Sequence, residues 1–121
     1  MKTETIEDFM NKKDKFILDE NNNVVTANLL EWGTFLNNRD RVIVKKEIID
    51  GKEISTVFIG IDHNWMRREI PCKPHIFETM VFDKGYSDIY CDRYSTWKEA
   101  EEGHEKAVQW VKRGCKNENV D

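Results

Sequence analysis

The sequence predicts an α+β fold, an antiparallel sheet of about four to five strands with two main helices packed on it. The dipeptide Asp50-Gly51 lies between two apolar, β-branched runs and can supply both positive-φ positions of a tight hairpin turn. Farther along, Thr96-Trp97-Lys98-Glu99 has the pattern of a capping box that opens a helix. The strand signals between two helical segments predict a meander.

The N-terminal part of the chain predicts an arm followed by a small hairpin. Residues 1–14 are mostly charged or polar, with Ile6, Phe9 and Met10 at helical spacing, so they can form a short amphipathic helix or a loose arm. The apolar runs 16–18 and 24–25 flank the polar segment 19–23, whose Asn and Asp residues tolerate the left-handed conformation of a tight reversal.

The middle of the chain predicts a helix and then the first half of the meander. Thr26 can cap a helix that reaches Asn38, with Leu29, Trp32 and Leu36 on one stripe facing a sheet. The runs 42–44 and 57–61 are then expected to form a hairpin over residues 41–61.

The C-terminal part predicts two more strands and the longest helix. Residues 76–82 are mostly apolar on both alternating faces, and 89–94 form the expected antiparallel partner. The helix after Thr96 runs to about Arg113, where Gly114 stops it. Its core stripe is expected to contain Trp97, Ala100, His104, Ala107, Val108 and Val111. We therefore expect one domain over residues 15–114, followed by a disordered tail over 115–121.

Composition limits the partners and the compartment. The 121 residues carry a formal charge of −4 and a pI of about 5.4, so nucleic acid is not an expected partner. The three cysteines follow no C-x-x-C spacing and the N-terminus lacks a secretory stretch, which favours a reducing, cytoplasmic location. No run approaches the roughly 18 apolar residues of a membrane span.

Candidate site residues begin with the segment 62–75, which is longer than a usual hairpin connection. It contains Asp62 and His63, and also Arg67 and Arg68, which could hold an anion or simply be solvated.

Glu78 interrupts the otherwise apolar strand 76–82, and Arg93 on the next strand is its expected partner. The two can form a structural ion pair or hold a polar ligand together.

These groups could converge at one end of the meander. We predict one polar cluster of Asp62, His63, Glu78, Arg93 and His104, with Arg67, Arg68, Phe82 and Tyr94 completing a ligand-binding set.

The side-chain types of a metal site are present in three histidines and two carboxylates, His63, His75, His104, Asp62 and Glu78. No metal-binding spacing signature joins them, and a lone histidine on an apolar helix stripe is more often a hydrogen-bonded core residue. Nucleophile motifs and glycine-rich phosphate loops are absent from the sequence. We therefore assign no catalytic residue, metal or cofactor.

Three blocks of sequence resemble a family of short proteins encoded by tailed phages and prophages. They are STVFIGIDHN at 55–64, FETMVF at 77–82 and RYSTWKEAEEGH at 93–104, and the likeness extends over roughly residues 16–112. After Asn64 the family tends to carry a glycine-rich stretch, whereas this chain has Trp65-Met66-Arg67-Arg68-Glu69. The family has no assigned activity, so the resemblance implies a mobile-element origin.

By analogy with small phage accessory proteins, we expect a binding protein that is not an enzyme. It would act stoichiometrically on a host protein, for example a host defence protein, or sequester a small anionic or nucleotide signal. The alternative is a small hydrolase that uses Asp62, His63, Glu78 and His104 around a divalent metal. A virion or assembly component is a third class, and the sequence leaves a homo-oligomer open.

Overall fold

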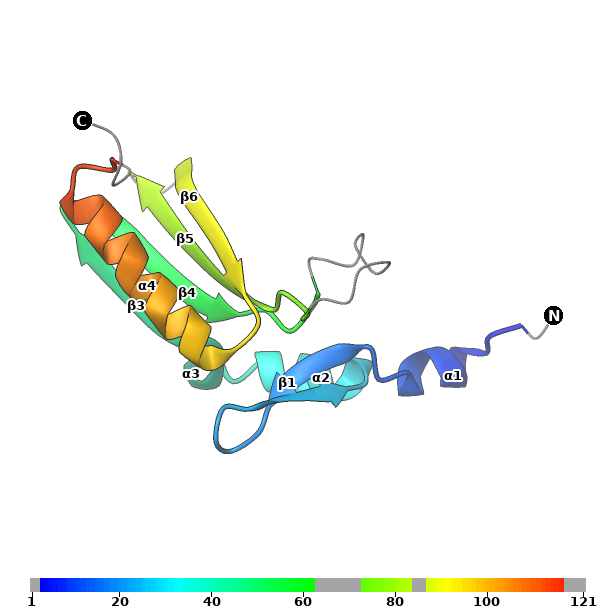
Figure 1. Cartoon of the computed structure of the whole chain (residues 1–121). Coiled ribbons are helices and arrows are strands. Elements are labelled where there is room, and N and C mark those ends of the chain that lie inside the picture. Colours follow the sequence, from blue (N-terminus) through cyan, green and yellow to red (C-terminus); the bar gives the residue numbers. More distant parts are fainter. Residues whose placement is uncertain (1–2, 63–72, 84–86, 117–121) are drawn as a thin grey trace.

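A computed structural model describes residues 3–62, 73–83 and 87–116 of the chain. The elements follow one another in this order (Figure 1): α1 (Ile6–Asn11), β1 (Lys15–Leu18), β2 (Val24–Ala27), α2 (Leu29–Leu36), α3 (Arg39–Val42), β3 (Ile43–Ile49), β4 (Lys52–Phe58), β5 (Phe77–Asp83), β6 (Ser87–Tyr94) and α4 (Trp97–Lys112).

The predicted α+β class and the antiparallel meander are confirmed. Strands β3, β4, β5 and β6 form one sheet in sequence order, and β1 pairs with β2 in a separate hairpin. The turn between β3 and β4 is the predicted one, since Asp50 has a φ of 51° and Gly51 a φ of 77°. Both values lie in the left-handed region that a type I′ turn requires.

The predicted hairpin within residues 41–61 is confirmed. The apolar runs 42–44 and 57–61 mark only its outer ends, since β3 continues to Ile49 and β4 starts at Lys52. Both strands contain alternating polar residues because only one of their faces is buried, so an apolar run marks only part of each strand. Gly60, with a φ of 69°, lies beyond the end of β4.

The predicted helix over 26–38 was displaced. Thr26 belongs to β2, and α2 begins after Asn28, whose side chain accepts a hydrogen bond from the Glu31 amide at 2.9 Å. The Glu31 carboxylate in turn accepts from the Asn28 amide at 2.9 Å. This reciprocal capping box is a better N-terminus than a lone threonine, because it satisfies two backbone N–H groups together.

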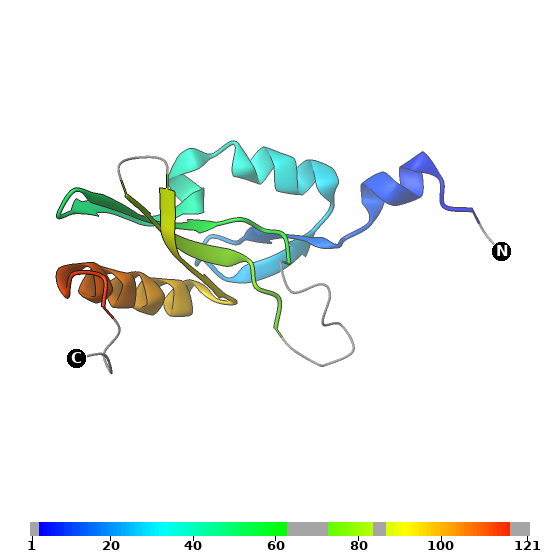
Figure 2. The same ribbon diagram turned by 90° about the horizontal axis from the view of Figure 1, so that it is seen from above.

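Helix α4 covers one face of the sheet (Figures 1 and 2). The predicted stripe is confirmed, since five of its members are buried and Trp97 is half-buried. Phe58 and Phe77 lie beside each other under the first turns, with ring centroids 5.1 Å apart, and Phe77 makes an edge contact with Trp97 at 6.2 Å. The main core therefore lies between α4 and the alternate residues of β4 and β5.

Helices α2 and α3 lie on the other side of the strands from α4 (Figure 2). Helix α2 contacts mainly β1 and α3, and Phe35 joins it to the core through an edge contact with Phe58 at 5.7 Å. Within the described residues, no helix has the length and apolar character needed to cross a membrane.

Candidate functional site

Glu78 and Arg93 face each other across β5 and β6, as the sequence predicted. They are register partners, and the Arg93 Nε donates to the Glu78 Oε2 at 3.0 Å. The Glu78 side chain is 15% exposed and that of Arg93 41% exposed. The pair lies on the sheet face that α4 does not cover, because the flanking residues Phe77 and Thr79 are buried on the α4 side. This side of the sheet, away from α4, is called the open face below.

His104 belongs to α4, and its side chain packs against the opposite face of the sheet. Its ring is 1% exposed and bridges two groups, with Nδ1 2.7 Å from the Thr56 Oγ1 and Nε2 2.7 Å from the Glu47 Oε2. The Thr56 hydroxyl also contacts the Thr79 hydroxyl at 2.5 Å. The side chain of Thr79 therefore points toward His104, and that of its neighbour Glu78 points away.

The prediction of one polar cluster was therefore wrong for Glu78, Arg93 and His104. Side chains alternate between the two faces of a strand, so the sheet itself separates the ion pair from the histidine. Phe82 lies half-buried in β5 at the same alternation as Glu78. Tyr94 packs with the core under α4, so the expected ligand-binding set is divided between the two faces.

The Thr56, His104 and Glu47 side chains have the order of a nucleophile, a base and an orienting acid. However, Thr56 is 0% exposed, and no substrate can reach a hydroxyl sealed between a helix and a sheet. The hydrogen bond from His104 lowers the pKa of Glu47. This arrangement satisfies buried polar groups, which would otherwise destabilise the core.

Sequence reasoning missed Glu47, Thr56 and Thr79. The available signal was the alternation in 52–58, which places Thr56 between the buried Ile54 and Phe58. A hydroxyl at a core position requires a partner, and the histidine in the α4 stripe was a suitable one.

Asp62 follows the end of β4 and contacts the chain just before β5. Its Oδ1 accepts a hydrogen bond from the His75 amide at 3.1 Å, which holds the end of the β4 region near the approach to β5. The predicted site residues His63, Arg67 and Arg68 lie outside the described residues. Among the residues that are described, no group of three His, Cys, Asp or Glu side chains could hold a metal.

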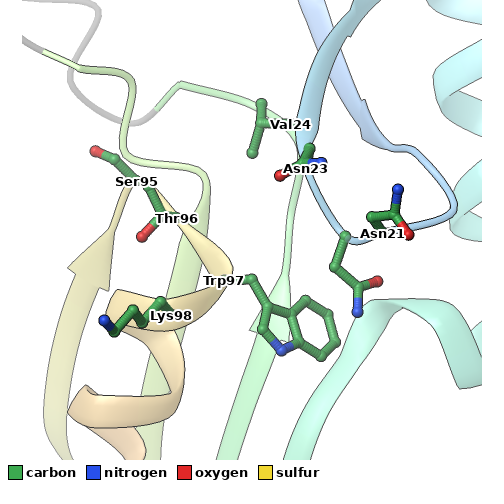
Figure 3. A pocket seen from close by; sticks show the side chains of 8 residues that line it. Asn21, Asn23, Val24, Ser95, Thr96, Trp97 and Lys98 are labelled. Carbon is green, nitrogen blue, oxygen red and sulfur yellow. The ribbon is translucent and has the colours of Figure 1, made fainter.

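A cleft that the sequence did not indicate lies between the β1–β2 loop and the start of α4 (Figure 3). It has a volume of about 500 Å³ and is lined by Asn21, Asn22, Asn23, Val24, Ser95, Thr96, Trp97 and Lys98. We call it the Asn–Trp cleft. In Figure 3 the Trp97 ring extends toward the loop that carries Asn21. Its two walls are far apart in sequence, so only folding brings them together.

The loop wall of the cleft is fixed by Asp19. The Asp19 Oδ1 accepts hydrogen bonds from the amides of Asn21 at 2.8 Å and Asn23 at 2.9 Å. These backbone hydrogen bonds lower the pKa of Asp19, and the one from the Asn23 amide has the largest effect. The Arg41 guanidinium donates to the Asp19 carbonyl at 2.6 Å and thereby ties the loop to α3.

The helix wall of the cleft is fixed by the predicted cap. The Thr96 hydroxyl accepts a hydrogen bond from the Glu99 amide at 3.1 Å, and the Glu99 carboxylate accepts from the Ser95 amide at 3.3 Å. The first turn of α4 therefore already holds a carboxylate of its own. The groups left to a ligand are side-chain amides, the Trp97 ring and the exposed Lys98 ammonium.

Comparison of the chain with protein-family models, with curated proteins and with solved structures finds no match in any of the three.

Proposed function

We propose that this chain is a phage or prophage accessory protein that binds its target without catalysis, and that it sequesters a small anionic ligand in the Asn–Trp cleft. The observation that carries the proposal is the combination of side chains in that cleft. Side-chain amides of the 21–23 loop lie across from an indole ring, and Lys98 also lines this cleft of about 500 Å³. This volume lies in the range of about 300–1,000 Å³ that is typical of small-ligand sites.

The chemistry of the cleft fits a nucleotide better than a bare anion. An indole ring can stack on a base, and asparagine amides can donate to and accept from the edges of the base. Lys98 supplies one compact positive charge for a phosphate. The Glu99 carboxylate already accepts from the Ser95 amide at the first turn of α4, so this helix start offers a bare anion little attraction, whereas a base can also stack on the indole ring.

Calorimetric titration with adenosine and guanosine monophosphates, their cyclic forms and inorganic phosphate tests this proposal. We expect one nucleotide to bind with a stoichiometry of one per chain and phosphate alone to bind far more weakly. Lys98→Ala should weaken nucleotide binding about tenfold, as the loss of one charge-assisted contact does.

The matched control is Lys106→Ala, because Lys106 is exposed on the same helix but does not line the cleft. Equal loss in both variants would indicate nonspecific attraction, and no binding of any probe would contradict the nucleotide proposal.

A second candidate is stoichiometric binding of a host protein through the open face. The observation that favours it is the placement of the half-buried Met80 and Phe82 beside the Glu78–Arg93 pair. Apolar side chains next to charged groups are the composition expected for a protein interface. Met80→Glu should abolish capture of a specific host protein, whereas Lys116→Glu, on an exposed residue after α4, should leave the capture intact.

The metal-dependent hydrolase has less support. His104 is buried under α4 and hydrogen-bonded to Thr56 and Glu47, whereas Glu78 belongs to the open face. Elemental analysis of the purified protein would revive this alternative if it found a stoichiometric metal that a chelator removes together with an activity.

A further inference from the structure

The first helix presents apolar side chains to solvent. In α1, Ile6 is 84% exposed, Phe9 54% and Met10 39%. Glu4 and Glu7 are also exposed, so the segment combines apolar and acidic groups. Figures 1 and 2 show α1 projecting from the body of the molecule. We call residues 4–10 the arm.

A groove of complementary character lies where α2 and α3 meet the sheet. Its volume is about 400 Å³, and it is lined by Leu36, Arg39, Val42, Ile43, Lys46, Ser55, Val57, Phe58 and Ile59. The charged members of this lining are both cations. Lys46 pairs with Glu53 at 2.9 Å, whereas the Arg39 guanidinium has no partner within the described ranges. We call it the Arg39 groove.

The arm of the same chain lies away from this groove. Lys13, just after α1, is 3.8 Å from Glu31 in the first turn of α2. The Arg39 groove begins at Leu36, the last residue of α2. Eight helical residues span about 12 Å, so the arm and the groove are separated by the length of α2.

We infer that the Arg39 groove binds the arm of a second copy of this chain. Ile6 and Phe9 would fill the apolar part of the groove, and Glu4 and Glu7 would lie against Arg39. Both halves of the contact are present in every chain, so two copies can exchange arms about a two-fold axis and close the assembly as a dimer. This contact is independent of the Asn–Trp cleft. The groove adjoins the open face, because its lining residues Ser55 and Val57 are the register partners of Met80 and Glu78.

Sedimentation analysis of the full chain over a range of concentrations tests the inference. The wild type should sediment as a dimer at high concentration and dissociate on dilution. Ile6→Ser/Phe9→Ser and Arg39→Glu should each be monomeric over the same range, with circular dichroism spectra and melting temperatures like those of the wild type. The control variant Lys116→Glu, an exposed charge reversal outside both surfaces, should remain a dimer.

A mixing experiment separates arm exchange from a general effect of charge. Glu4→Lys/Glu7→Lys and Arg39→Glu should each be monomeric alone. In the first variant the arm and the groove are both positive, and in the second both are negative, so two copies of either variant repel each other. Mixed in equal amounts, they should form a heterodimer. The reversed arm of one then meets the reversed groove of the other, and the second contact is the wild-type pair. Asp8, which caps α1 through the Thr5 amide, is unchanged in both.

Three results would overturn the inference. One is a wild type that stays monomeric at every concentration, which would leave the groove to an acidic segment of another protein. Another is a dimer that survives both the arm and the groove substitutions. The third is a mixture that remains monomeric although the wild type dimerises.

Discussion

The Tyr94 ring lies directly against the backbone of Gly103, in the space that a side chain at position 103 would occupy. A Cβ built on Gly103 would overlap the Tyr94 ring carbons and hydroxyl. The hydroxyl is buried and has no hydrogen-bond partner among the described residues, and burial raises the pKa of this phenol. Glycine is therefore required here for close approach of α4 to β6.

Gly103→Ala should destabilise the protein. Alanine gains about 1 kcal/mol of helix propensity over glycine, but overpacking against the ring costs about 1–3 kcal/mol, so urea denaturation should show a net loss. Gly33→Ala is the control. It lies within α2 and its added Cβ would meet nothing within 4 Å, so it should raise stability by about 0.5–1 kcal/mol. Equal effects at the two positions would contradict the contact.

Thr56→Val should test how much the hydrogen-bonded side chains of Thr79, Thr56, His104 and Glu47, called the polar row here, stabilise the fold. The substitution keeps the shape but removes the hydroxyl, so the His104 Nδ1 and the Thr79 hydroxyl each lose a partner. We expect a loss of about 1–3 kcal/mol in the free energy of unfolding. Thr34→Val on the exposed surface of α2 should change it by less than about 0.5 kcal/mol. A stable Thr56→Val variant would mean that the row contributes little.

Glu47 should make stability depend on acid pH. Its pKa in the folded protein lies below the ordinary value of 4.5, first because of the hydrogen bond from His104. Between the folded pKa and 4.5, the Glu47 carboxyl is more protonated in the unfolded chain than in the folded protein. The stabilisation that the His104 hydrogen bond gives is therefore complete above pH 4.5, and it is lost as the pH falls through the folded pKa.

Glu47→Gln keeps an acceptor for His104 and removes the titration. Free energies of unfolding measured between about pH 3 and pH 7 should therefore converge for the two proteins at the acid end. Wild-type and variant curves that stay parallel would rule out this source of pH dependence.

Glu78→Gln should have little effect on stability. Arg93 is 41% exposed, and partly solvated ion pairs contribute about 0–1 kcal/mol. Glu53→Gln, which breaks the more exposed pair with Lys46, should also have little effect in thermal melting. If the open face binds a host protein, the Glu78 variant should lose that binding while it remains folded. A large drop in melting temperature for Glu78→Gln would instead assign the pair a structural role.

The elements set by local chemistry could be predicted from the sequence alone. Asp50-Gly51 predicted a hairpin because few residues adopt positive φ without strain, and the structure places that turn at these residues. Thr96 and Glu99 predicted the start of α4 because a hydroxyl and a carboxylate at this spacing satisfy backbone amides. The apolar stripe of α4 then predicted which face is buried.

Only the tertiary structure decided which side chains meet. His104 bonds Thr56 and Glu47, which lie 48 and 57 positions away, and no local signal encodes such a distance. The sequence predicted the Glu78–Arg93 pair because neighbouring strands were evident, but it grouped the pair with His104. A strand pattern alone leaves open which face of the sheet each side chain joins, because a shift of one residue reverses it. The Asn–Trp cleft and the Arg39 groove likewise join distant segments, so they exist only once the core has packed.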